Sequence, residues 1–199
     1  MKRNIFICIL LWCAMTLSAQ TTTQILDRTA SVVGRKGGCA ASFTFSHPQT
    51  GKVNGQIQLK GQKFHTTMQG MEVWFNGKTQ WTYQASTDEV NISTPTAAQR
   101  QQMNPYAFIT LYKRGYTCTH KIQGGNYLVT LTAQNKKSAM PLINITIRKS
   151  DNVPTQIRFT QNGQPVTITI QQFKAQNQAD ALFVFNSKKY PTAEIIDLR

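Results

Sequence analysis

Residues 70–115 read GMEVWFNGKTQWTYQASTDEVNISTPTAAQRQQMNPYAFITLYKRG. This stretch combines β-hairpins with helical segments and indicates the fold of the whole chain. Its first part carries an apolar run before Asn76-Gly77 and alternating Trp81 and Tyr83 after it, and this dipeptide suits the positive φ angles of a two-residue hairpin turn. A second hairpin follows, and then the period changes. Thr94-Pro95 predicts a helix start, with residues 96–103 as a polar helical segment.

The end of this stretch is too apolar to lie bare in water. After Asn104-Pro105, the segment carries Tyr106, Phe108, Ile109, Leu111 and Tyr112. A surface helix keeps one polar face towards solvent, so a helix this apolar has to rest on another apolar surface. We therefore expect residues 105–113 to form a lid over the hydrophobic face of the preceding sheet.

The remaining sequence alternates apolar and polar residues with a period of two, which is typical of strands with one buried face. Examples are Ala41-Ser42-Phe43-Thr44-Phe45 and Ile143-Asn144-Ile145-Thr146-Ile147. These runs predict about ten or eleven strands in one antiparallel sheet that is polar on one side. Residues 21–33 instead have the spacing of an amphipathic helix, which Gly34 ends. We expect residues 20–199 to form a single domain.

Residues 1–19 have the features of a secretory signal peptide. A basic start and an apolar core precede Leu17-Ser18-Ala19, a cleavage site of small residues. The apolar core is shorter than the roughly 20 residues that span a bilayer. We therefore expect cleavage near Ala19-Gln20 and a soluble, exported mature chain.

The chain is strongly basic. Its formal net charge is +14, and loss of Lys2 and Arg3 with the signal peptide leaves about +12. The basic residues are scattered and form no nucleic-acid motif, so we expect no nucleic-acid partner. Two interpretations stay open: a positive surface that only keeps the protein soluble, or one that approaches anionic lipid or an acidic partner.

Two cysteines remain after signal cleavage, Cys39 and Cys118. In an oxidising compartment this pair is a candidate disulfide, which would tie the first strand to the strand after the lid. Two free thiols are the alternative.

The sequence lacks motifs of catalysis and of metal or nucleotide binding. His47, His65 and His120 are far apart and have no Cys or carboxylate at metal-ligand spacing. Asp88 and Glu89 are adjacent, but neighbours on a strand point to opposite faces, which does not suit an acid–base pair. We expect no enzyme, no metal and no cofactor.

The helices are too few to cover so large a sheet, which predicts uncovered apolar area on its inner face. Flexible Met68 and Met71 lie among the aromatic residues there, and unbranched thioethers adapt to irregular ligands. Such a cavity suits acyl chains, because each buried methylene contributes about 0.8 kcal/mol.

Together, these residues resemble the LolA-type outer-membrane lipoprotein carriers. The resemblance rests on Asn76-Gly77-Lys78-Thr79 with Trp81 and Tyr83, on Asn104-Pro105-Tyr106-Ala107-Phe108, and on Ala41-Ser42-Phe43. It implies an incomplete, unclosed antiparallel β-barrel, mostly β, whose few short α-helices lid a hydrophobic cavity. It also implies a periplasmic carrier that takes lipoproteins from an inner-membrane ABC-type complex and delivers them to an outer-membrane acceptor.

From the alternation and the resemblance, we expect acyl chains to contact the inner face of the sheet and the underside of the lid. The sheet residues are Phe43, Phe45, Ile57, Leu59, Phe64, Met68, Val73, Trp74, Trp81 and Tyr83, and the lid residues are Phe108, Ile109 and Leu111. The carrier is expected to be a monomer with acylated lipoproteins as cargo.

One feature of the carriers is missing from this sequence. Their lid is held shut by an arginine in a Lys-Arg-Pro-Asn stretch after the second strand, and the matching place here reads Lys60-Gly61-Gln62-Lys63. Closure would therefore depend on Lys60, on Lys63 or on packing alone.

Three other functions are also compatible with this sequence. The same fold could sense lipoproteins or stray lipid as a periplasmic adaptor, or bind lipids in general. A plain structural β-domain with a filled core is the third alternative.

Overall fold

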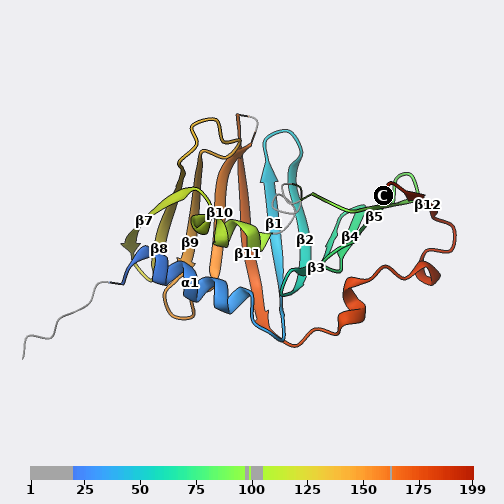
Figure 1. The fold of residues 1–199 in the computed structure, drawn as a ribbon, viewed down its shortest axis with the longest axis horizontal. Helices are drawn as coiled ribbons and strands as arrows, with labels where there is room; N and C mark the ends of the chain where they lie inside the picture. Colours follow the sequence, from blue (N-terminus) through green and yellow to red (C-terminus); the bar gives the residue numbers. More distant parts are fainter. Residues whose placement is uncertain (1–19, 97–98, 100–104, 162) are drawn as a thin grey trace, which may run out of the picture.

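The computed structural model describes residues 20–96, 99, 105–161 and 163–199. They form one 12-stranded sheet with the order β12-β6-β5-β4-β3-β2-β1-β11-β10-β9-β8-β7 (Figure 1). The strands are β1 (Cys39–His47), β2 (Gly51–Lys60), β3 (Lys63–Met68), β4 (Met71–Phe75), β5 (Gln80–Gln84), β6 (Glu89–Ser93), β7 (Tyr116–Gln123), β8 (Asn126–Ala133), β9 (Leu142–Arg148), β10 (Pro154–Gln161), β11 (Gln164–Ala175) and β12 (Glu194–Asp197).

The sheet is open, because β12 and β7 stand at its two ends and do not pair with each other. This confirms the predicted unclosed antiparallel barrel, with one or two strands more than the alternation indicated. The last strand, β12, pairs in parallel with β6. The other neighbouring pairs are antiparallel, and all of them except β1–β11 join strands that follow each other through short hairpins.

Two helices rest on one face of the sheet, which we call the inner face. They are α1 (Thr22–Val33) and α3 (Pro105–Thr110), and α3 continues into the 3₁₀ turn η1 (Leu111–Lys113). Figure 1 shows α1 running along one end of the strands and α3 crossing them nearer their middle. Both helices contribute to a core of buried side chains from β8 to β11.

The predicted helix at residues 21–33 is confirmed, and its start has a clear local cause. Thr21 is the N-cap, and a capping box joins its side chain to Gln24. Ile25 and Leu26 are completely buried against the sheet. No helix in the described part of the chain is long and apolar enough to cross a membrane.

The predicted second helix start is only partly visible. The Gln99 backbone N–H donates to the Thr96 hydroxyl, and the Thr96 N–H donates to Gln99 Oε1, which is the hydrogen-bond pattern of a capping box. The rest of the predicted polar helix, and the predicted signal peptide at residues 1–19, lie outside the described residues.

The predicted disulfide is wrong, because both cysteines are free. Cys39 opens β1 and Cys118 lies in β7, and four strands separate β1 from β7 in the sheet. Since neighbouring strands are about 4.8 Å apart, the two residues are roughly 24 Å apart, whereas the Cα atoms of a disulfide lie within about 7 Å.

Candidate functional site

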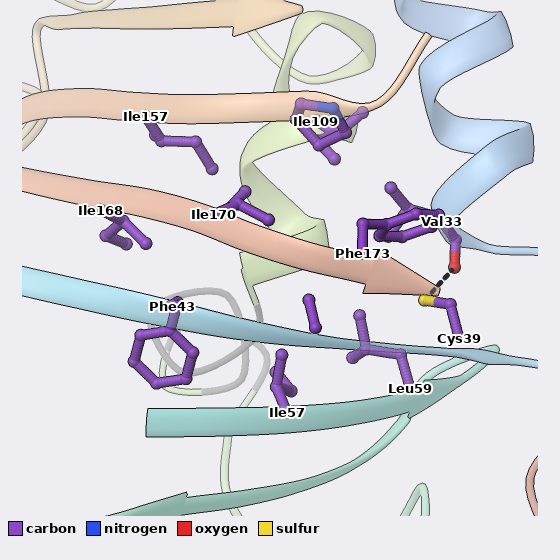
Figure 2. A pocket seen from close by; sticks show the side chains of 12 residues that line it. Val33, Cys39, Phe43, Ile57, Leu59, Ile109, Ile157, Ile168, Ile170 and Phe173 are labelled. Atoms are coloured by element: carbon purple, nitrogen blue, oxygen red, sulfur yellow. Dashed lines mark hydrogen bonds between the residues drawn. The ribbon is translucent and has the colours of Figure 1, made fainter. Parts of the chain in front are cut away.

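An apolar cavity lies between the inner face of the sheet and the two helices (Figure 2). Its walls come from both helices and from four neighbouring strands, β2, β1, β11 and β10. The lining residues are Val33, Cys39, Ala41, Phe43, Ile57, Leu59, Ile109, Pro154, Ile157, Ile168, Ile170 and Phe173.

The cavity is small in this structure. Its volume is about 70 Å³, whereas pockets that enclose small-molecule ligands measure roughly 300–1,000 Å³. A long acyl chain therefore fits only if the helices above the cavity move.

A β-bulge in β11 aims two residues at the cavity. The register of β1 against β11 shifts between Ala40 and Ser42, and Gln172 takes a φ of 47° at this place. The extra residue in the bulge lets Ile170 and Phe173, three positions apart, both face inward. Regular alternation would have pointed one of them away.

The ring of Phe43 lies across β2 because its neighbour there has no side chain. Phe43 and Gly55 are opposite each other in the antiparallel pair. A Cβ at Gly55 would lie 2.5 Å from Phe43 Cζ and 2.8 Å from the Thr67 carbonyl oxygen, closer than atoms can pack. Glycine at this position therefore keeps the ring against the sheet, where it forms one end of the cavity in Figure 2.

The underside of α3 and η1 is apolar and buried. Phe108, Ile109 and Leu111 are 4%, 2% and 2% exposed. The Phe108 ring packs on Phe159 of β10 at a centroid distance of 4.9 Å, and Ile109 points into the cavity. The predicted lid is therefore closed here by packing, but Phe108 and Leu111 pack on the strands that follow the lid, and only Ile109 packs on those that precede it.

Asp27 of α1 also connects the two helices. It accepts a hydrogen bond from the Tyr112 hydroxyl, and its Oδ1 lies 3.1 Å from Lys113 Nζ. These two partners hold the pKa of Asp27 below its usual range. The end of the lid is thus tied to α1 through a charged carboxylate.

Of the alternatives for closure of the lid, packing is the one found, and Lys60 and Lys63 do not contribute. Both ammonium groups instead pair with Asp180, at 3.1 and 2.8 Å. Asp180 belongs to the 3₁₀ turn η2 (Asp180–Phe183), so these lysines fasten the C-terminal segment to the sheet.

Cys39 is part of the cavity wall and is held neutral there. Burial raises the pKa of its thiol to about 11. The thiol donates to the Val33 carbonyl oxygen at a distance of 3.3 Å, drawn as the dashed line in Figure 2. The wall therefore stays uncharged at neutral pH.

We expect Asp27→Asn to loosen the lid. Uptake of a fluorescent fatty-acid probe should become about two- to fivefold faster at neutral pH, the modest effect typical of an exposed ion pair. Because the folded-state pKa of Asp27 is lowered, the link is present at neutral pH and is lost as the pH falls through that pKa. Wild type should therefore approach the variant in acid, as measured by stopped-flow fluorescence.

Asp151→Asn is the matched control, because Asp151 pairs with Arg148 away from the two helices. An equal acceleration by both substitutions would show that the Asp27 link does not govern uptake.

The predicted lipid-contacting residues fall into three groups. Phe43, Ile57, Leu59 and Ile109 line the cavity. The second group packs in the inner core beside the cavity or lies along the inner face, and consists of Phe45, Phe64, Met68, Val73, Phe108 and Leu111. Whether either group binds lipid stays a prediction.

The third group, Trp74, Trp81 and Tyr83, was placed on the wrong face. Val73 faces the inner core, so its neighbour Trp74 points to the outer face, and the register puts Trp81 and Tyr83 there too. On the inner face, β5 presents polar Gln80, Thr82 and Gln84 instead.

These outer-face aromatics are covered by the C-terminal segment. The Trp74 ring lies 5.3 Å from Phe185 and 5.6 Å from Tyr190, and Tyr83 lies 4.6 Å from Tyr190, between ring centroids. We call Trp74, Tyr83, Phe185 and Tyr190 the outer aromatic cluster. Both faces of β4 are therefore buried, which explains its continuous apolar run.

Several lining residues were missing from the predicted set. Val33 was visible in the apolar stripe of the first helix, and the alternation of the late strands marked the isoleucines. Their place in the site follows from β11 lying beside β1, which the alternation of single strands does not reveal. The missed residues are Val33, Cys39, Ala41, Pro154, Ile157, Ile168, Ile170 and Phe173.

The fold is similar to that of a protein of known structure. An uncharacterized conserved protein from Thermus thermophilus is similar with a TM-score of 0.60 and 14% sequence identity, over 88% of this chain and 98% of that chain. A LolA superfamily protein from Nitrosomonas europaea has a TM-score of 0.47 and 11% identity, over 84% of this chain and 99% of that chain. A comparison with curated proteins found no match.

An open sheet with helices closing an apolar cavity defines a carrier-type fold. The model of the family described as outer membrane lipoprotein carrier protein LolA matches residues 13–164. This is more than half of the sequence, and the chain belongs to that family.

Proposed function

We propose that the protein is a periplasmic carrier that binds the acyl chains of lipoproteins released from the inner membrane and takes them to the outer membrane. The observation that carries this proposal is the wholly apolar cavity beneath a closed lid. Its cargo would be acylated lipoproteins, supplied by an inner-membrane ABC-type complex and passed to an outer-membrane acceptor.

Loading requires the lid to move. The cavity of about 70 Å³ is the closed state, and the first acyl methylenes would enter between Ile109 and the β1–β11 pair. Each methylene removed from water contributes about 0.8 kcal/mol, so a roughly 16-carbon chain supplies on the order of 12 kcal/mol. That is enough to displace the three buried side chains of the lid, whose burial is worth about 1.5–3 kcal/mol each.

The uncharged wall also suits acyl chains rather than headgroups. Cys39 stays neutral, and the other lining residues are aliphatic, aromatic or proline. A charged or strongly polar group placed there would lose its hydration without gaining a partner. The peptide part of a lipoprotein would therefore stay outside the cavity.

Native mass spectrometry with a synthetic lipopeptide tests the proposal. The protein should form a complex with a triacylated peptide and none with the same peptide lacking acyl chains, and the complex should release its cargo to outer-membrane vesicles. Binding of free fatty acid but not of the lipopeptide would indicate a general lipid-binding protein. Lipopeptide binding without release would indicate a sensor, and no binding at all a filled structural core.

A further inference from the structure

Positive charge is concentrated in one half of the sheet. Residues 105–175, which hold α3 and β7–β11, contain nine Lys or Arg residues and a single acidic residue, Asp151. Most of the other acidic residues lie at the opposite end of the strand order, in or beside β4, β6 and β12: Glu72, Asp88, Glu89, Glu194 and Asp197.

Three of these basic residues gather beside the end of the lid. Arg114 directly follows η1, and its backbone N–H donates to the Leu111 carbonyl oxygen at 2.8 Å. Lys136 and Lys137 lie in the β8–β9 loop, which is joined to the start of β7 by a hydrogen bond from the Gln134 N–H to the Gly115 carbonyl oxygen, 2.9 Å. Figure 1 shows this loop projecting beyond the strands.

We call Arg114, Lys136 and Lys137 the basic corner. Its three cations are exposed, and no carboxylate of the described residues lies within ion-pair distance of them.

We propose that the basic corner docks the protein on an anionic phospholipid surface. Each Lys or Arg near an anionic leaflet strengthens binding about fivefold. This inference rests on the proposed function. The contact would bring the end of the lid to the bilayer that supplies the acyl chains or receives them. Lipid is a better match than an acidic protein because the proposed cargo leaves one bilayer and enters another, and these cations lie beside the end of the lid.

Co-sedimentation of the purified protein with vesicles tests the docking surface. Vesicles of phosphatidylcholine and phosphatidylglycerol in equal parts should bind wild type, and vesicles of pure phosphatidylcholine should not. The double variant K136A/K137A should bind the anionic vesicles about 30-fold more weakly. Added salt should weaken wild-type binding, because the contact is exposed to solvent.

K188A/K189A is the matched control. It removes the same charge from another exposed Lys-Lys pair, which lies in the 3₁₀ turn η3 (Ser187–Lys189) of the C-terminal segment. It should change vesicle binding less than twofold. Arg114→Ala, expected to weaken binding about fivefold, gives a second test within the basic corner.

Equal weakening by both lysine pairs would overturn the proposal, because binding would then follow net charge alone. Equal binding to neutral vesicles, or binding to an acidic polypeptide but not to anionic vesicles, would overturn it too. Lipopeptide binding in the absence of vesicles is measured separately. K136A/K137A should keep that binding, so a failure of docking and a failure of the carrier function give different results.

Discussion

Ala41→Phe is expected to weaken binding of a fluorescent fatty-acid probe by roughly fifteenfold or more. Ala41 is a small, half-buried residue in the cavity wall, so a phenyl ring at this position occupies the space that the chain would enter. Losing the burial of only two methylenes costs about 1.6 kcal/mol, or roughly fifteenfold in the dissociation constant. The measurement is fluorescence titration, with the thermal unfolding midpoint as a check of folding.

Ala40→Phe is the matched control for this prediction. Ala40 precedes Ala41 in β1 and is paired with Gln58 and Lys174 on the outer face. The same bulk added there should leave the dissociation constant of the probe within about twofold of wild type. If Ala41→Phe binds as wild type does, acyl chains do not use this cavity.

Trp74→Ala is expected to lower the free energy of unfolding by about 3–5 kcal/mol. Trp74 is 6% exposed and contacts His65, Phe185 and Tyr190, so its loss leaves a void in the outer aromatic cluster. The C-terminal segment should lose protection in amide hydrogen exchange. Binding of the fatty-acid probe should change little, because this cluster and the cavity are on opposite faces.

Phe159→Ala gives the complementary result. Phe159 is 9% exposed and packs under Phe108 of α3 on the inner face. Its truncation should destabilise the protein by a similar amount but weaken probe binding, while the C-terminal segment stays protected. If Trp74→Ala instead loses probe binding while the C-terminal segment stays protected, the outer aromatic cluster belongs to the lipid-binding site.

The covering of β4 on both faces explains why the sequence misplaced Trp74. Alternation identifies the inner face only where the outer face is polar, and Val73, Trp74 and Phe75 are all buried. The second cover is the C-terminal segment, which follows β4 by about a hundred residues. No residue near β4 in the sequence indicates this cover.

The two cysteines also show that the sequence does not reveal which distant strands lie side by side. Their number and compartment made a disulfide reasonable, but the strand order places Cys39 at the centre of the sheet and Cys118 at its edge. Strand order depends on which distant segments pair, and one alternating strand resembles another.

The sequence by itself determined the elements of this protein. Period-two alternation specified an antiparallel sheet, the Thr21 capping box started the first helix, and the apolar composition of residues 105–113 required a lid. These are local signals, in which a few neighbouring residues suffice to favour one backbone conformation. The tertiary structure alone decided which walls meet at the cavity, because β11 lies beside β1 and the bulge at Gln172 turns Phe173 inward. It also gathered scattered basic residues into one corner, since packing and pairing of distant strands set these neighbours.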